Sequence, residues 1–157
     1  MKITFLTVGK TEDAYLKDGI DKYVKRLKHY AKLELVDLPE LKNTKALTPD
    51  QQKTKEAEII LKKVSTTDYL ILLDENGTEY TSQQFANYIE KKGISATSSL
   101  VFVVGGPYGF DQSVYQRAND KLSFSRMTFS HQMIRLFFVE QLYRAFTIIK
   151  GEPYHHQ

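Results

Sequence analysis

Three segments in the last third of the chain carry residue types that could hold a ligand and handle a proton. The first is an apolar run that ends in glycines, LVFVVGGPYGF at 100–110, where the backbone can approach a ligand closely. The second, SFSRMTF at 123–129, mixes hydroxyl groups with apolar side chains, a combination suited to a purine ring. The third is the tail PYHHQ at 153–157, whose tyrosine and imidazoles could stack on a base and move a proton. Taken singly, the segments are also compatible with a turn, a core strand and a loose C-terminus.

An alternation of apolar strands and amphipathic helices predicts the scaffold that would position these segments. We expect strands at 2–8, 33–38, 68–73, 100–104 and 126–129. We expect helices at about 16–31, 49–64, 82–92, 113–120 and 131–150, with capping boxes at Thr48/Gln51 and Thr81/Gln84. This order predicts one α/β domain over 1–157, a parallel sheet with helices on both faces. Such sheets bind ligands beyond the carboxyl ends of their strands, so the DENG loop at 74–77, the glycine loop and the 123–129 segment are expected to meet.

The composition excludes several kinds of site. The 157 residues contain no cysteine, which rules out disulfides, thiolate metal sites and cysteine nucleophiles. The four histidines include no His-x-x-x-His pair, so we expect no metal. No run of 18 apolar residues is present, and we expect no membrane contact and a cytoplasmic location. The spacing of GGPYG differs from the Gly-x-Gly-x-x-Gly of dinucleotide sites, which disfavours a nicotinamide-dependent oxidoreductase without removing that alternative.

Positive charge is concentrated toward the N-terminus, although the net charge is only +3. Residues 1–63 carry 14 Lys/Arg against 10 Asp/Glu. Four basic residues fall largely off the apolar stripe of the first helix: Lys22, Lys25, Arg26 and Lys28. They predict either a surface for a polyanion or an ordinary solvated helix face.

The last helix carries a wide apolar stripe. It consists of Ile134, Phe138, Leu142, Ala145, Phe146 and Ile149, widened by Met133 and Phe137. This width predicts either a homodimer contact or a fully buried core helix. On the same helix Arg135 and Arg144 could face a phosphate, whereas the i,i+4 spacing of Glu140 and Arg144 also suits a simple ion pair.

Several segments, taken together and in order, resemble one family. They are MKITFLTVGK, LLDENGTEYTSQQFA, VFVVGGPYGF, LSFSRMTFSHQMIR and VEQLYRAFTIIKGEPYHH, and they cover essentially the whole chain. The chain resembles the small SPOUT-class RNA methyltransferases, specifically the RlmH family, also called YbeA. The resemblance implies that S-adenosylmethionine methylates N3 of a pseudouridine in 23S ribosomal RNA, on the assembled ribosome, leaving S-adenosylhomocysteine. It also implies a homodimer, a C-terminal trefoil knot and no metal.

The resemblance also assigns residues. The cofactor contacts that it implies are Leu73, Gly105, Gly106, Phe124, Ser125, Arg126, Met127, Thr128 and Phe129. The catalytic candidates are Tyr154, His155 and Arg144, presented across the dimer, with His155 positioning or deprotonating the base that Tyr154 stacks on. The RNA contacts expected are Lys22, Lys25, Arg26, Lys28 and Arg135. This chain has Ser130, a good helix cap, where most of the family has proline. A SPOUT methyltransferase for another RNA and a non-catalytic ribosome- or RNA-binding dimer are the alternatives.

Overall fold

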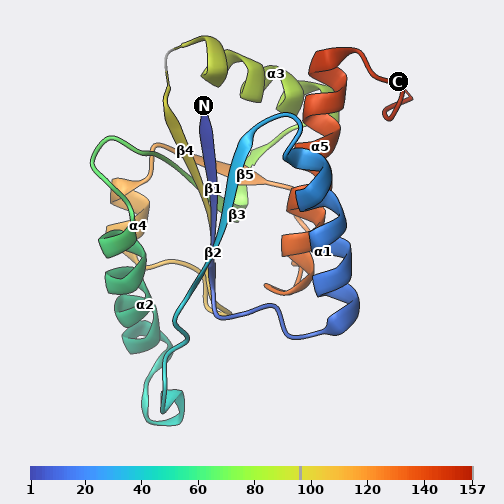
Figure 1. Ribbon diagram of the computed structural model, residues 1–157. Helices are drawn as coiled ribbons and strands as arrows, with labels where there is room; N and C mark the ends of the chain where they lie inside the picture. The colour runs from blue at the N-terminus through green and yellow to red at the C-terminus, as the bar shows by residue number, and fades with distance from the viewer. Residues whose placement is uncertain (96, 157) are drawn as a thin grey trace.

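The computed structural model describes residues 1–95 and 97–156, and within them five parallel strands form one sheet (Figure 1). The strands are β1 (Lys2–Val8), β2 (Lys32–Leu38), β3 (Tyr69–Glu79), β4 (Ser99–Val104) and β5 (Asp120–Ser123), in the order β2-β1-β4-β3-β5. Every neighbouring pair is parallel. The helices are α1 (Ala14–Leu27), α2 (Pro49–Lys63), α3 (Ser82–Ile94), α4 (Gln112–Arg117) and α5 (Met133–Lys150), with a 3₁₀ turn at Thr44–Ala46. The predicted α/β fold, a parallel sheet with helices on both faces, is confirmed.

Alternation of side chains along the central strands explains why both faces of the sheet are covered. In β4, Leu100 and Phe102 belong to one apolar cluster, and Val101 and Val103 belong to the other. The first cluster is closed by α1, α3 and α5, and the second by α2 and α4. Figure 1 shows the two groups of helices on opposite sides of the sheet. A strand buried on both faces must be apolar at every position, which is the continuous run found at 100–104.

Local signals set most helix ends as predicted. Thr48 with Gln51 and Thr81 with Gln84 each form a reciprocal capping box at the start of α2 and α3. Helix α5 ends at Gly151, which adopts the left-handed conformation (φ 70°). At the other end of α5, the hydroxyl of Ser130 accepts from the N–H of Met133 at 3.0 Å, so Ser130 closes the turn in front of the helix. None of the helices in the part of the chain that the structure describes is long and apolar enough to cross a bilayer.

The final strand is the clearest departure from the sequence prediction. The strand expected at 126–129 does not form, and the sheet instead ends with β5 at Asp120–Ser123. Two side chains turn the chain out of the sheet. The hydroxyl of Ser123 donates to the carbonyl of Ser125 at 2.9 Å, and the hydroxyl of Ser125 accepts from the N–H of Met127 at 2.9 Å. Such local bonds compete with strand pairing and leave 124–131 as a loop.

Strand β3 is also longer than predicted. The DENG sequence at 74–77 was expected to end the strand as a turn, but β3 continues to Glu79 with an irregularity between Leu73 and Thr78. Both flanks of the irregularity pair with Leu122 of β5. The bulged residues 74–77 therefore stay at the edge of the sheet beside the loop that follows β5.

Candidate functional site

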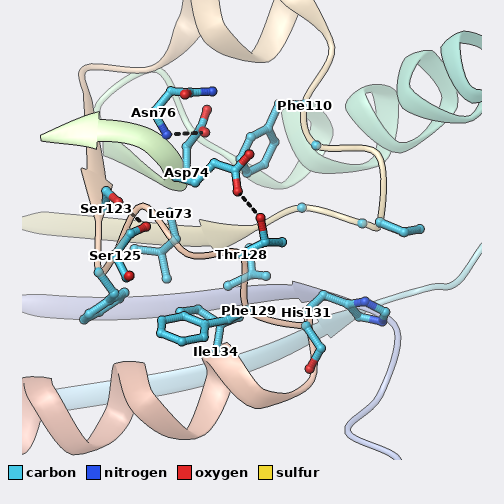
Figure 2. Close-up of a pocket in the computed structure, with 18 of the residues that line it drawn as sticks. Leu73, Asp74, Asn76, Phe110, Ser123, Ser125, Thr128, Phe129, His131 and Ile134 are labelled. Atoms are coloured by element: carbon cyan, nitrogen blue, oxygen red, sulfur yellow. Dashed lines mark hydrogen bonds between the residues drawn. The ribbon is translucent and has the colours of Figure 1, made fainter. Parts of the chain in front are cut away.

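A cavity of about 510 Å³ lies at the carboxyl ends of β3 and β4. Its walls come from 73–76 at the bulge of β3, from 104–110 at and beyond the end of β4, from 122–131 without residue 126, and from Tyr115 and Ile134. Figure 2 shows Leu73, Asp74 and Asn76 on one side of the cavity and Phe129, His131 and Ile134 on the other. The three segments that the sequence predicted to meet at this edge therefore do meet, because parallel strands bring their carboxyl ends together.

Most of the residues assigned to the cofactor line this cavity. They are Leu73, Gly105, Gly106, Phe124, Ser125, Met127, Thr128 and Phe129. Arg126 does not line it. Its side chain points to solvent, 90% exposed, and its Nε donates to Glu79 at 3.0 Å. The loop turns at Ser125, and this turn sends Arg126 outward while Ser125 and Met127 border the cavity.

The 124–131 loop is tied to the end of β3. The hydroxyl of Thr128 donates to Oε2 of Glu75 at 2.6 Å, which links the two walls across the mouth of the cavity. On the β3 side, Asp74 accepts from the hydroxyl of Tyr115 and from the N–H of Asn76. Burial and the bond to Asp74 raise the pKa of Tyr115 above its ordinary value, so this phenol stays a donor. Side-chain hydrogen bonds thus hold the segments that form the mouth of the cavity in place.

The electrostatics of the cavity favour a cation. Two carboxylates, Asp74 and Glu75, line it, and none of its described lining residues is a lysine or an arginine. Its remaining walls are largely apolar side chains and glycine backbone. Asp74 is half-buried and Glu75 is exposed, so water screens the attraction of Asp74 for a positive charge less than that of Glu75. The cavity suits a ligand that combines a flat apolar group with a positive charge. In residues 1–95 and 97–156, no cluster of three His, Asp or Glu side chains could hold a metal ion.

The three catalytic candidates form a second cluster. Nη1 of Arg144 lies 3.1 Å from Nδ1 of His155, and the Arg144 guanidinium lies 4.7 Å from the ring centre of Tyr154. Nε of Arg144 also donates to Glu140 at 2.9 Å, so the predicted i,i+4 ion pair is confirmed. The hydroxyl of Tyr154 lies 3.3 Å from that of Tyr23 on α1. The tail at 153–156 is therefore held against α1 and α5; Gln157 lies outside the described residues.

Arg144 fixes the proton position on His155. A guanidinium has only donors, so Nδ1 of His155 must accept and Nε2 must carry the hydrogen. The outward nitrogen is then a hydrogen-bond donor. The neighbouring phenol is a donor as well, since burial and the bond to Tyr23 raise the pKa of Tyr154 to about 12. The cluster thus presents hydrogen-bond donors from His155 and Tyr154.

The cavity and the tail cluster lie at opposite ends of α5. Ile134 lines the cavity, and Arg144 is ten residues later, which is ~15 Å along a helix axis. In Figure 1, α5 starts near the carboxyl edge of the sheet and ends toward the opposite edge, where the N-terminus also lies. Within one chain the two groups of residues do not converge.

The basic residues of α1 border the tail cluster. Lys22, Lys25 and Lys28 are exposed. The guanidinium of Arg26 lies 5.4 Å from the ring centres of both Tyr23 and Tyr143, and Tyr143 in turn packs edge-on against Tyr154. Positive charge and aromatic rings therefore form one continuous surface, the combination that binds nucleic acid phosphates and bases.

Arg135 departs from its predicted role as an RNA contact. Its side chain is 1% exposed and lies between α5 and the loop after β1. It donates to the carbonyls of Val8, Gly9 and His131, each at 3.0 Å. A guanidinium buried in this way positions the β1–α1 loop against the start of α5 and presents no surface to a phosphate.

Sequence reasoning missed some residues that shape the cavity. Tyr115 and the bond between Glu75 and Thr128 leave no local signal, since their partners lie 41 and 53 residues away. Glu56 did leave one. It is a charged residue on the face of α2 that also presents Ala57 and Ile60 to the core, and a buried carboxylate there calls for an explanation.

Comparisons with known proteins agree with this geometry. A family model described as a predicted SPOUT methyltransferase matches residues 1–155. Proteins named ribosomal RNA large subunit methyltransferase H are similar over the full length. The one from Parabacteroides distasonis is 54% identical over all of both chains, and the one from Cytophaga hutchinsonii is 56% identical over 99% of this chain and all of its own. The one from Flavobacterium johnsoniae is 54% identical over all of both chains. With its parallel α/β sheet and the cavity at the strand ends, the chain belongs to the RlmH family of SPOUT-class methyltransferases.

Proposed function

We propose that the protein uses S-adenosylmethionine to methylate large-subunit ribosomal RNA, specifically N3 of a pseudouridine in 23S ribosomal RNA, on the assembled ribosome. The observation that carries the proposal is the cavity at the ends of β3 and β4, which combines purine-sized apolar walls with two carboxylates in a chain of a methyltransferase family. A ribosomal substrate implies a cytoplasmic location.

The cavity residues fit the proposed donor. S-adenosylmethionine has an apolar, flat adenine and a positively charged sulfonium, and when bound it supplies an electrophilic methyl group. Leu73, Val104 and Ile134 provide apolar walls, while Asp74 and Glu75 provide negative charge for the cation. A volume of about 510 Å³ lies within the ordinary range for ligand sites. The proposed product, S-adenosylhomocysteine, lacks the sulfonium charge and so loses part of this attraction.

The separation of the cavity from the tail cluster supports a homodimer. Tyr154, His155 and Arg144 of one chain lie too far from their own cavity to reach a methyl group there. A second chain could bring its tail to the cavity. Apolar surface near the start of α5 supports such a contact. The rings of Phe129 and Phe137 lie 5.1 Å apart, tilted by 44°, and each side chain is more than a third exposed, while Tyr15 is 64% exposed. We also expect the C-terminal trefoil knot that the family resemblance implies.

The chain's own residues have separate tasks in this proposal. The cavity fixes the donor and excludes water, while the tail and α1 orient the RNA base. The donor held by the cavity residues would supply the methyl group to N3, and the N3 proton would pass to the bulk buffer, because Arg144 already occupies the acceptor nitrogen of His155. His155 donates from Nε2 to a base carbonyl, because Arg144 holds its Nδ1 as an acceptor. Of the two roles expected for His155, positioning the base and removing its proton, the proposal takes the first.

The RNA contacts proposed for α1 suit a large preformed substrate. Lys22, Lys25, Arg26 and Lys28 add salt-sensitive phosphate contacts but read no sequence. The chain is a single small domain, so recognition of the correct nucleotide is expected to come from the shape of the ribosome around it.

Transfer of a labelled methyl group tests the proposal. Intact ribosomes that lack the modification should accept label from S-adenosylmethionine, and separated subunits or naked ribosomal RNA should accept much less. Analysis of the labelled nucleoside should give N3-methylpseudouridine. Label in transfer RNA but not in ribosomes would identify transfer RNA as the substrate. Binding of the cofactor without transfer to any RNA would favour a non-catalytic RNA- or ribosome-binding protein.

The role of His155 has its own test within the same assay. His155→Gln keeps a donor, whereas His155→Ala removes it. We expect the glutamine variant to be ~10-fold more active than the alanine variant, which is the order of one hydrogen bond in a transition state. Equal activities of the two variants would exclude the donor role.

A further inference from the structure

Glu56 is a buried carboxylate on α2, and it has no ion-pair partner among residues 1–95 and 97–156. Its side chain is 5% exposed, and none of the ion pairs among the described residues includes it. Burial raises the pKa of its carboxyl group, while hydrogen bonds from Gln52 and from the backbone of Gly106 oppose the rise. A carboxylate held in this environment costs stability that an apolar residue of similar size would not cost. Its presence therefore calls for a compensating role.

The carboxylate of Glu56 lies directly behind the glycine loop. A Cβ atom placed on Gly106 would lie 2.5 Å from Oε2 and 2.7 Å from Oε1 of Glu56, closer than real side-chain contacts. Nε2 of Gln52 donates to Oε2 from the other side at 3.3 Å. Gly106 itself lines the cavity, and its carbonyl accepts from the N–H of Gly109 at 3.2 Å. The backbone at Gly106 thus lies between the carboxylate of Glu56 and the cavity.

We propose that Glu56 is a positioning residue for the cavity: it holds the backbone at Gly105 and Gly106 where the ligand needs it, and residue 106 must be glycine to let that carboxylate approach. The identity of the ligand rests on the proposed function, but the contact itself does not. Glu56 touches no ligand and acts only through the loop.

A positioning role and a purely structural role predict opposite patterns. If Glu56 only supported the fold, replacing it would lower stability and ligand affinity together. If it holds the loop at a cost in stability, an apolar replacement should weaken binding while leaving the melting temperature unchanged or higher. The pair of effects is therefore diagnostic.

The first experiment uses three variants of the full chain. Glu56→Met fills the space without an acceptor, Glu56→Gln keeps an acceptor oxygen, and Glu58→Met is the control on the exposed face of the same helix. We expect Glu56→Met to raise the dissociation constant for S-adenosylhomocysteine by ~10-fold, and Glu56→Gln to stay within ~2-fold, as expected for the loss of one hydrogen bond. The control should match the wild type. Unchanged binding in Glu56→Met, or a parallel fall of melting temperature and affinity in both Glu56 variants, would overturn the proposal.

A readout without ligand separates this inference from the choice of cofactor. Hydrogen exchange at the amide of Gly106, followed by NMR, should be faster in Glu56→Met and close to wild type in Glu56→Gln. If the wild type binds neither S-adenosylmethionine nor S-adenosylhomocysteine, the proposed cofactor fails, and the exchange rates still decide whether Glu56 holds the loop. Exchange that is the same in the wild type and in Glu56→Met would exclude the anchor.

A double-mutant cycle tests the steric half of the argument. Gly106→Ala alone should weaken binding strongly, because its Cβ displaces the carboxylate. In the Glu56→Ala background the carboxylate is absent, so Gly106→Ala should raise the dissociation constant of the ligand by a several-fold smaller factor. Additive effects of the two substitutions would show that the residues do not interact.

Discussion

The two ends of α5 are built in different ways. At its start, the cavity is made of glycine backbone, strand ends and apolar side chains that one chain brings together. At its end, the tail cluster is made of charged and aromatic side chains from α1 and α5 on the surface. The first depends on the sheet, and the second depends on two helices and four tail residues.

This difference implies that the two ends of α5 have different functions, one in binding the donor and the other in binding RNA. A small ligand of fixed shape can be enclosed by backbone, whereas a large RNA must be met at a surface by side chains that reach out. Changes at one end should therefore affect binding of the donor, and changes at the other end should affect transfer to RNA. The five predictions below test that separation.

Removal of the tail after Gly151 should have the largest effect. Without Tyr154 and His155 we expect methyl transfer to fall by at least ~100-fold, the loss that follows when a reacting group is no longer aligned. The dissociation constant for S-adenosylmethionine should change by less than ~2-fold, because none of the described tail residues, 153–156, lines the cavity of its own chain. Equal loss of binding and transfer would contradict the separation.

Arg135 should affect folding rather than RNA binding. In Arg135→Met the carbonyls of Val8, Gly9 and His131 lose their donor, and we expect the free energy of unfolding to fall by ~3 kcal/mol. Chemical denaturation measures this loss. Arg126→Met, at a side chain that is 90% exposed, is the matched control and should cost less than ~0.5 kcal/mol. A stable Arg135→Met protein with weakened RNA binding would restore the original prediction.

Gly105→Ala should narrow the cavity. The added Cβ would lie 3.1 Å from the ring of Phe110 and 3.3 Å from the carbonyl of Gly109. We expect KM for the donor to rise by ~10-fold with kcat unchanged at saturation, since the contact affects binding and not alignment of the RNA. Titration calorimetry of the RNA-free variant with the donor should show the same ~10-fold rise in the dissociation constant. A lower kcat with normal KM would place residue 105 in the alignment of the substrate instead.

The exposed lysines should control salt dependence. Each phosphate contact adds ~1 to the slope of log affinity against log salt, so Lys22→Ala with Lys25→Ala should reduce the slope for ribosome binding by up to ~2. Donor binding should not change with these substitutions. Lys62 and Lys63, at the end of α2 on the other face of the sheet, provide the charge-matched control. A slope that is equally reduced by both pairs would mean that net charge, not the α1 surface, drives binding.

The smallest expected effect is that of the Tyr154 hydroxyl on stability, and it is confined to alkaline pH. Its pKa is raised to about 12 in the folded protein from an ordinary 10.0. Because the folded state holds this proton more tightly, its contribution to stability is complete below pH ~10 and is lost as the pH rises toward ~12. Tyr154→Phe should therefore flatten the fall in melting temperature between these pH values. If the melting temperature of Tyr154→Phe falls as steeply as that of the wild type, the loss of stability comes from other tyrosines.

The sequence predicted the fold more reliably than it predicted single side chains. Continuous apolar runs and capping boxes are local, and they located β1, β4, α2 and α3 within a residue or two. The strand expected at 126–129 was wrong because serine hydroxyls at 123 and 125 turn the backbone, a competition that hydrophobic pattern does not reveal. Arg135 was assigned to RNA because sequence shows its charge but not the carbonyls that surround it.

The sequence by itself determined the parallel α/β architecture, the family and the three segments that meet at the cavity. These follow from periodicity, caps and ordered motifs, which depend on neighbours along the chain. Only the tertiary structure decided that Arg126 and Arg135 lie outside the site, that Arg144 sets the tautomer of His155, and that Glu56 lies behind Gly106. These contacts join residues that are mostly distant in sequence, and their geometry depends on burial and on directional hydrogen bonds that only the folded chain defines.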